Sequence, residues 1–126
     1  MITMDSTAQV RILADVLNAW ANGIREHRPH VVASYFTQKA LFQGFDRTQT
    51  IGKPGIVAYY DKQPPGLSPT YRIQEHRQLS DDALISYVDV DFTLPDGEVI
   101  PVHLTALLEL VAGSWLISHY HVSKIQ

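Results

Sequence analysis

The sequence has 126 residues, of which 45% are hydrophobic and 18% charged, as is typical of one folded domain. The formal net charge of −3 argues against a nucleic-acid partner or an anionic membrane surface, because both select basic patches. The absence of cysteine excludes disulfides, thiolate nucleophiles and cysteine-ligated metals. No apolar run reaches the ~18–20 residues that span a bilayer. The N-terminus also lacks the basic and apolar regions of a signal peptide, so we expect a cytoplasmic protein.

The beginning of the chain predicts two helices. Asp5 or Ser6 can cap a helix of about 20 residues. Its apolar face repeats at the helical period and comprises Val10, Leu13, Ala14, Leu17, Trp20, Ala21 and Ile24. Pro29 then suits the first turn of a short second helix, expected over His30–Phe36.

A short strand, a loop and a third helix follow. Ala40–Phe45 is expected to be the strand, and the polar segment Asp46–Gly52 the loop. A third helix opens at Lys53, with a proline at its first turn. The prolines and glycine of Gln63–Gly66 end it.

The rest of the chain predicts four consecutive antiparallel strands. Short turn sequences separate them, and the expected strands are Thr70–Leu79, Ala83–Leu94, Pro101–Leu110 and Ser114–Ile125. Helices followed by a run of strands indicate an α+β fold with the helices on one face of a sheet. Without repeats or linkers, the whole of 1–126 is expected to form a single domain. A bent sheet around helices leaves a hollow, which is a common place for a ligand.

Two stretches resemble known proteins. Thr105, Trp115 and the run HYHVS (His119–Ser123) stand at the spacing found at the end of the association domain of calcium/calmodulin-dependent kinase II. Ala40–Gly66 is similar to bacterial SgcJ/EcaC-type and SnoaL-like proteins, which are often encoded with natural-product pathways. The chain therefore resembles the nuclear transport factor 2-like superfamily over nearly its whole length. The resemblance implies a cone in which three N-terminal helices pack against a curved, mostly antiparallel sheet.

The resemblance leaves the chemistry open, because the superfamily holds isomerases, cyclases, dehydratases, epoxide hydrolases and binding-only domains. The position of the base of ketosteroid isomerase corresponds to Gln43, which cannot accept a proton. The pocket arginines of the kinase association domain correspond to Asp89, Ala106 and Val122, so an anionic ligand bound in that manner is not expected. The same correspondence implies that Asp89 faces the inside of the cone.

Tyr87, Asp89 and Asp91 share one face of an expected strand, because side chains alternate along it. Inside an apolar cone, desolvation favours the protonated form of a carboxylate, which would suit Asp89 to general acid or base catalysis. The alternative is that this face is solvated.

His103 lies across the next hairpin. In one register it opposes Asp89 as a base–orienter pair, and in the other it points to the convex surface, where this fold commonly dimerises.

The last strand carries three further candidates. His119 and His121 share a face and, with His103, could form a three-histidine metal cluster. No carboxylate stands at ligand spacing, so packing or interface histidines are favoured, and we expect neither a metal nor a cofactor. Tyr120 would then lie on the inner face beside Ala106. There its hydroxyl would either donate to a ligand carbonyl or serve packing alone.

Aromatic side chains line the helical side, namely Tyr35, Phe42, Tyr59, Tyr60 and Tyr71. They suit either a core or a mouth for a flat polyketide-like or terpenoid ligand, gated by the loops Thr48–Ile51 and Pro64–Pro69. Trp115 is expected to be buried and Ile117 to lie on the convex face.

Two functions are therefore expected as alternatives. The first is a small natural-product pathway enzyme that acts on an apolar, carbonyl-bearing metabolite by cofactor-free acid–base chemistry, as a cyclase, isomerase, dehydratase or epoxide hydrolase. Its catalytic residues would be Asp89, His103 and Tyr120, and its ligand-binding residues Tyr35, Phe42, Gln43, Tyr60, Tyr87 and Asp91. The second is a binding or oligomerisation module without chemistry. In both, a homodimer through the convex sheet face is expected.

Overall fold

The computed structural model describes residues 3–125, so Met1, Ile2 and Gln126, which the expected domain includes, lie outside the described residues. The helices are α1 (Ser6–Arg25), α2 (Pro29–Ala33) and α3 (Lys53–Asp61). The Asp5 side chain caps α1 by accepting a hydrogen bond of 2.8 Å from the backbone N–H of Ala8. The apolar face of α1 packs inward, as its periodicity predicts.

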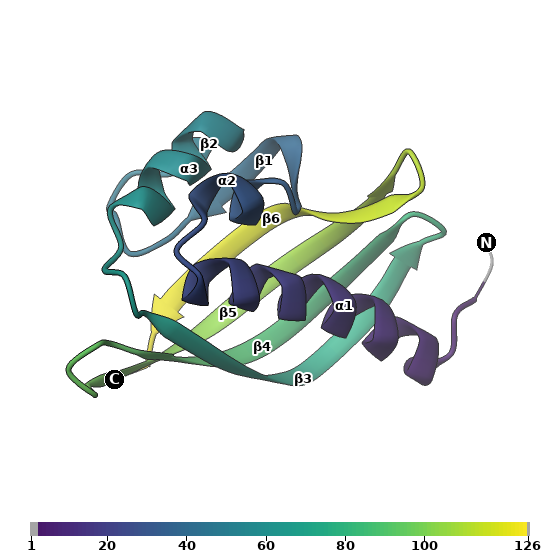
Figure 1. Ribbon diagram of the computed structural model, residues 1–126. Helices are drawn as coiled ribbons and strands as arrows, with labels where there is room; N and C mark the ends of the chain where they lie inside the picture. Colours follow the sequence, from purple (N-terminus) through teal and green to yellow (C-terminus); the bar gives the residue numbers. More distant parts are fainter. Residues whose placement is uncertain (1–2, 126) are drawn as a thin grey trace.

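The strands are β1 (Phe36–Gln43), β2 (Thr50–Ile51), β3 (Ser68–Ser80), β4 (Ala83–Thr93), β5 (Val99–Val111) and β6 (Ser114–Lys124). They form one six-stranded sheet in the order β2-β1-β6-β5-β4-β3. β3 to β6 are antiparallel neighbours, whereas β1 runs parallel to β6. Figure 1 shows the three helices on one face of this curved sheet. The predicted α+β fold is confirmed.

The second helix is shorter than expected, and β1 starts at Phe36 rather than Ala40. The reason is a contact with the end of the chain, in which the carbonyl of Tyr35 accepts a 2.8 Å hydrogen bond from the N–H of Ile117. This bond joins the segment to β6 and extends it. The expected loop Asp46–Gly52 contains β2, which pairs with β1.

A β-bulge in β6 changes which face its side chains occupy. Ile117 and His119 oppose the adjacent residues Leu108 and Leu107 of β5, so Ser118 is an extra residue between them. The alternation is therefore shifted, and Ile117 is buried in the core. The expectation that Ile117 lies on the convex face was wrong for this reason.

Candidate functional site

Aromatic rings occupy the hollow between the helices and the sheet. The ring of Phe42 stacks on that of Tyr120, with centroids 4.5 Å apart and planes 7° from parallel. Tyr60 meets Phe42 edge-on at 5.6 Å, and Trp20 lies 6.0 Å from both Phe92 and Tyr120. The inside of the cone is therefore a packed core rather than an open pocket.

Three of these rings also share hydrogen bonds. The indole N–H of Trp20 donates to the hydroxyl of Tyr60 over 3.0 Å, and Tyr60 is hydrogen-bonded to Tyr120. Desolvation by burial raises the pKa of both tyrosines well above the usual value, so both hydroxyls are neutral. Tyr120 faces inward beside Ala106, as predicted. Its role toward a ligand stays a prediction, because its hydroxyl is engaged within the protein.

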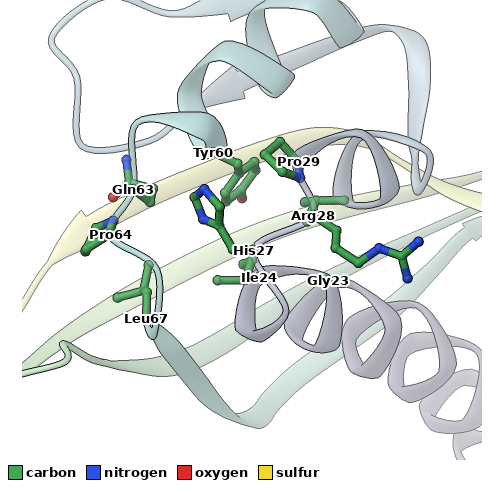
Figure 2. A pocket seen from close by; sticks show the side chains of 10 residues that line it. Gly23, Ile24, His27, Arg28, Pro29, Tyr60, Gln63, Pro64 and Leu67 are labelled. Carbon is green, nitrogen blue, oxygen red and sulfur yellow. The ribbon is translucent and has the colours of Figure 1, made fainter.

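The mouth of the cone is nearly closed. A hollow of about 10 Å³, the size of one water molecule, lies against Tyr60. Figure 2 shows the imidazole of His27 between Tyr60 and Gln63, with Pro29 on the other side of Tyr60. The two loops expected to gate a shared mouth line different hollows, because Thr48 and Thr50 face a separate one of about 250 Å³ beside α3.

The expectation that Asp89 faces inward was wrong. β4 buries the alternate residues Leu84, Ser86, Val88, Val90 and Phe92 against the helices. Tyr87, Asp89 and Asp91 consequently point to the convex face. Of the three positions matched to pocket arginines, only Ala106 and Val122 are buried on the inner face.

His103 does oppose Asp89, but on the convex side of the sheet. Its Nδ1 lies 2.8 Å from Asp89 Oδ1. The carboxylate accepts in this contact, so the Nδ1–H of His103 donates to Asp89. Nε2 of His103 forms no hydrogen bond within the described structure. Together with Tyr87 and Thr105, the pair lines a shallow hollow of about 220 Å³. Asp91 forms a separate ion pair with Arg72 at 3.4 Å.

The other predicted ligand-binding residues lie apart from the ring cluster. Gln43 ends β1, and its amide donates to the backbone carbonyl of Asp46. Tyr71, expected among the aromatic residues of the mouth, donates its hydroxyl to the side-chain oxygen of Asn18 on α1 over 2.6 Å. Tyr35 is half-buried in a groove beside the start of β6. Phe42 and Tyr60 are thus the members of the predicted set that the fold brings together with Tyr120.

An apolar row on the convex face was missed from the sequence. The strand register places Ile85, Leu107, His119, Leu41 and Ile51 side by side across β4, β5, β6, β1 and β2. We call these five residues the convex row. Leu41 is 49% exposed and Ile51 67%, and Tyr87 beside the row is 58% exposed. Outward apolar positions on successive strands are the signal that could have revealed it.

Neither a metal cluster nor a membrane helix is found in the part of the chain that the structure describes. No three histidine, aspartate or glutamate side chains among residues 3–125 gather as a metal site would require. None of the described helices is both long enough and apolar enough to cross a membrane.

Solved structures establish the fold class of this protein. A ketosteroid isomerase-like protein from Erwinia carotovora atroseptica is 23% identical, with a TM-score of 0.75 over 94% of this chain and 97% of that one. A candidate calcium/calmodulin-dependent protein kinase II association domain from Xanthomonas campestris is 19% identical, with a TM-score of 0.79 over 91% and 86%. An NTF-2-like protein of unknown function from Shewanella oneidensis is 17% identical, with a TM-score of 0.79 over 90% and 98%.

The chain therefore has the cone-shaped fold of the nuclear transport factor 2-like structures, as its sequence predicts. No protein-family model and no curated protein matches the sequence. At these identities the likeness defines the fold, and the function must be argued from the surfaces of this chain.

Proposed function

We propose that this protein is a binding and assembly domain in which two copies associate through the convex face of the sheet. The convex row is the observation that carries the proposal, because it places four apolar side chains and one histidine side by side on successive strands, with Leu41 and Ile51 exposed. Contiguous apolar surface of this kind marks interaction sites in soluble proteins. A sheet face without a covering layer can bury that surface against another sheet.

The charges of the convex face favour a second copy as the occupant. Asp89 lies beside His103, Asp91 beside Arg72, and Glu75 pairs with Arg77 at 2.9 Å. Each of these carboxylates thus has its partner within the same face. These local pairs reduce the repulsion between two identical faces that meet around a two-fold axis, although Glu109, exposed on the same face, forms no ion pair among residues 3–125.

The filled interior supports this role over a metabolite pocket. The rings of Phe42, Tyr60 and Tyr120 occupy the space that an apolar substrate would need. The hydroxyl of Tyr60 is also bonded to Trp20 within the protein. Natural-product tailoring inside the cone therefore stays a prediction that would require these rings to move.

The test is the oligomeric state in solution. The 14.2 kDa chain is expected to sediment as a dimer. Tyr87→Asp should yield monomers with an unchanged circular dichroism spectrum, because a charge in a buried interface is strongly disfavoured. Leu79→Asp is the matched control, since Leu79 is similarly exposed, at 54%, but lies at the far end of β3. A monomeric wild-type protein, or a dimeric Tyr87→Asp variant, would contradict the proposal.

A second candidate function is proton transfer by the pair of His103 and Asp89. The specific observation is the 2.8 Å contact, which holds the imidazole with its Nε2 free beside a hollow of about 220 Å³. In this role Asp89 positions the ring, and His103 accepts the proton as general base. Association of two convex faces would enclose this hollow and exclude water from it.

Base catalysis can be measured without knowing the natural substrate. A nitrobenzisoxazole serves as the probe, because its ring opens when a base removes the C–H proton. His103→Gln should lower the protein-catalysed rate by about 100-fold, and Asp89→Asn should lower it by a smaller factor. His121→Gln is the control, because this exposed histidine lies on the same face without a carboxylate partner in the described structure. A wild-type rate no faster than buffer would eliminate this candidate.

A further inference from the structure

A groove of about 440 Å³ runs along the helical side of the molecule, near the turn between β5 and β6. Ile12 and Val16 of α1 form one wall, and Trp115 and Leu116 at the start of β6 form the other. Tyr35, which joins α2 to β1, closes the end between them. The volume falls within the range of about 300–1,000 Å³ that is usual for small-molecule sites. Figure 1 shows α1 crossing in front of the sheet.

Two aromatic side chains line the groove from neighbouring backbone segments. Trp115 and Tyr35 are both only half-buried, so part of each ring is available to a ligand. The backbone of Tyr35 is tied to β6 by the 2.8 Å hydrogen bond from Ile117, two residues after Trp115. Both rings therefore stand on paired backbone rather than on loose loops, which lowers the entropy cost of binding.

The charged part of the groove lining is negative. Asp15 is exposed on α1 and is the one charged side chain that lines the groove. None of the ion pairs formed among residues 3–125 includes Asp15. No lysine, arginine or histidine lines this space, so an anionic ligand would meet repulsion without a compensating contact.

We propose that this groove binds an organic cation, namely an ammonium or guanidinium group carried on an apolar body. The cationic group would lie near the carboxylate of Asp15, and the body would pack against Trp115 and Tyr35. A cation is attracted both by a carboxylate and by the faces of aromatic rings, so the two features select the same ligand class. The helical side remains open when two convex faces meet, so this proposal does not depend on the assembly proposed above.

Nuclear magnetic resonance of the two tryptophan indole N–H groups provides the test. The probe is 2-phenylethylammonium, compared with neutral 2-phenylethanol and anionic phenylacetate. The ammonium compound should shift the signal of Trp115 in a saturable manner. The signal of Trp20 should stay in place, because its N–H is buried and bonded to Tyr60. The neutral compound should bind several-fold more weakly, and the anion should not bind.

Two variants test the assigned contacts. Asp15→Asn should weaken binding of the ammonium compound by about fivefold, as expected for an exposed ion pair, and leave the neutral compound unaffected. Asp61→Asn is the matched control, because Asp61 is also exposed on a helix but does not line the groove. Tyr35→Leu, which keeps Trp115 as the reporter, should weaken binding of both compounds. Equal affinity for cation, alcohol and anion, no shift at Trp115, or an unchanged Asp15→Asn affinity would overturn the proposal.

Discussion

Replacing Trp20 with alanine is expected to lower the free energy of unfolding by about 3–5 kcal/mol. Trp20 has no exposed surface, and its ring contacts those of Phe92 and Tyr120. The substitution leaves a cavity and also removes the N–H donor that bonds to Tyr60. A buried hydroxyl that loses its partner adds to the cost of the cavity. Urea denaturation followed by circular dichroism would measure the change.

The second tryptophan is the control for this experiment. Trp115 is half-buried, contrary to the expectation that it lies in the core. Trp115→Ala should therefore cost only about 1–2 kcal/mol, in proportion to its smaller buried area. Equal losses for the two variants would mean that Trp20 does not hold the core together in the way its contacts indicate.

Replacing Phe42 with alanine is expected to cost about 3–5 kcal/mol and to open a cavity in the middle of the cone. The ring of Phe42 contacts those of Phe36, Tyr59, Tyr60 and Tyr120, so its removal leaves a space with aromatic walls. A dry apolar cavity of this kind can take up benzene. Benzene should raise the melting temperature of the variant and leave that of the wild-type protein unchanged, because binding only to the folded state stabilises it.

This experiment also examines whether the cone can hold an apolar metabolite. Phe45→Ala is the control, because Phe45 is 37% exposed and its ring meets the ring cluster of the described structure through Phe92 alone, so its loss should cost far less. If the Phe42→Ala variant is destabilised but takes up no benzene, the neighbouring rings have collapsed into the space. That result would weaken the expectation of a ligand in the cone. Stabilisation of the wild-type protein by benzene would instead show that its rings already move apart.

Elements with strong local signals were predicted well. The capping carboxylate of Asp5 and the apolar period after it define α1. The turn residues at Pro95–Gly97 and Ala112–Gly113 correctly place the hairpins on either side of β5. The boundaries of α2 and β1 could not be obtained in this way, because a hydrogen bond from distant Ile117 sets them.

The candidate site was harder to predict because it depends on which face each strand buries. On β4 the alternation of residue types indicates which face is buried, since Val88 and Val90 are apolar while Asp89 and Asp91, which alternate with them, are charged. The correspondence with the pocket arginines of the kinase association domain placed Asp89 on the inner face of the sheet. That placement was wrong, because the neighbouring residues Val88 and Val90 are the ones that face inward. On β6 alternation was not enough, because the bulge at Ser118 shifts the pattern. No residue type in this part of the sequence predicts the bulge.

The parallel pairing of β1 with β6 has a consequence for how the chain folds during synthesis. Phe36 and Phe42 are made well before their strand partners Ile117 and Tyr120. The middle of the sheet is thus closed by contacts between residues about 80 positions apart in the chain, which slows folding. Until β6 has emerged, β1 has only the short strand β2 beside it, and its other edge is exposed to aggregation or to chaperones.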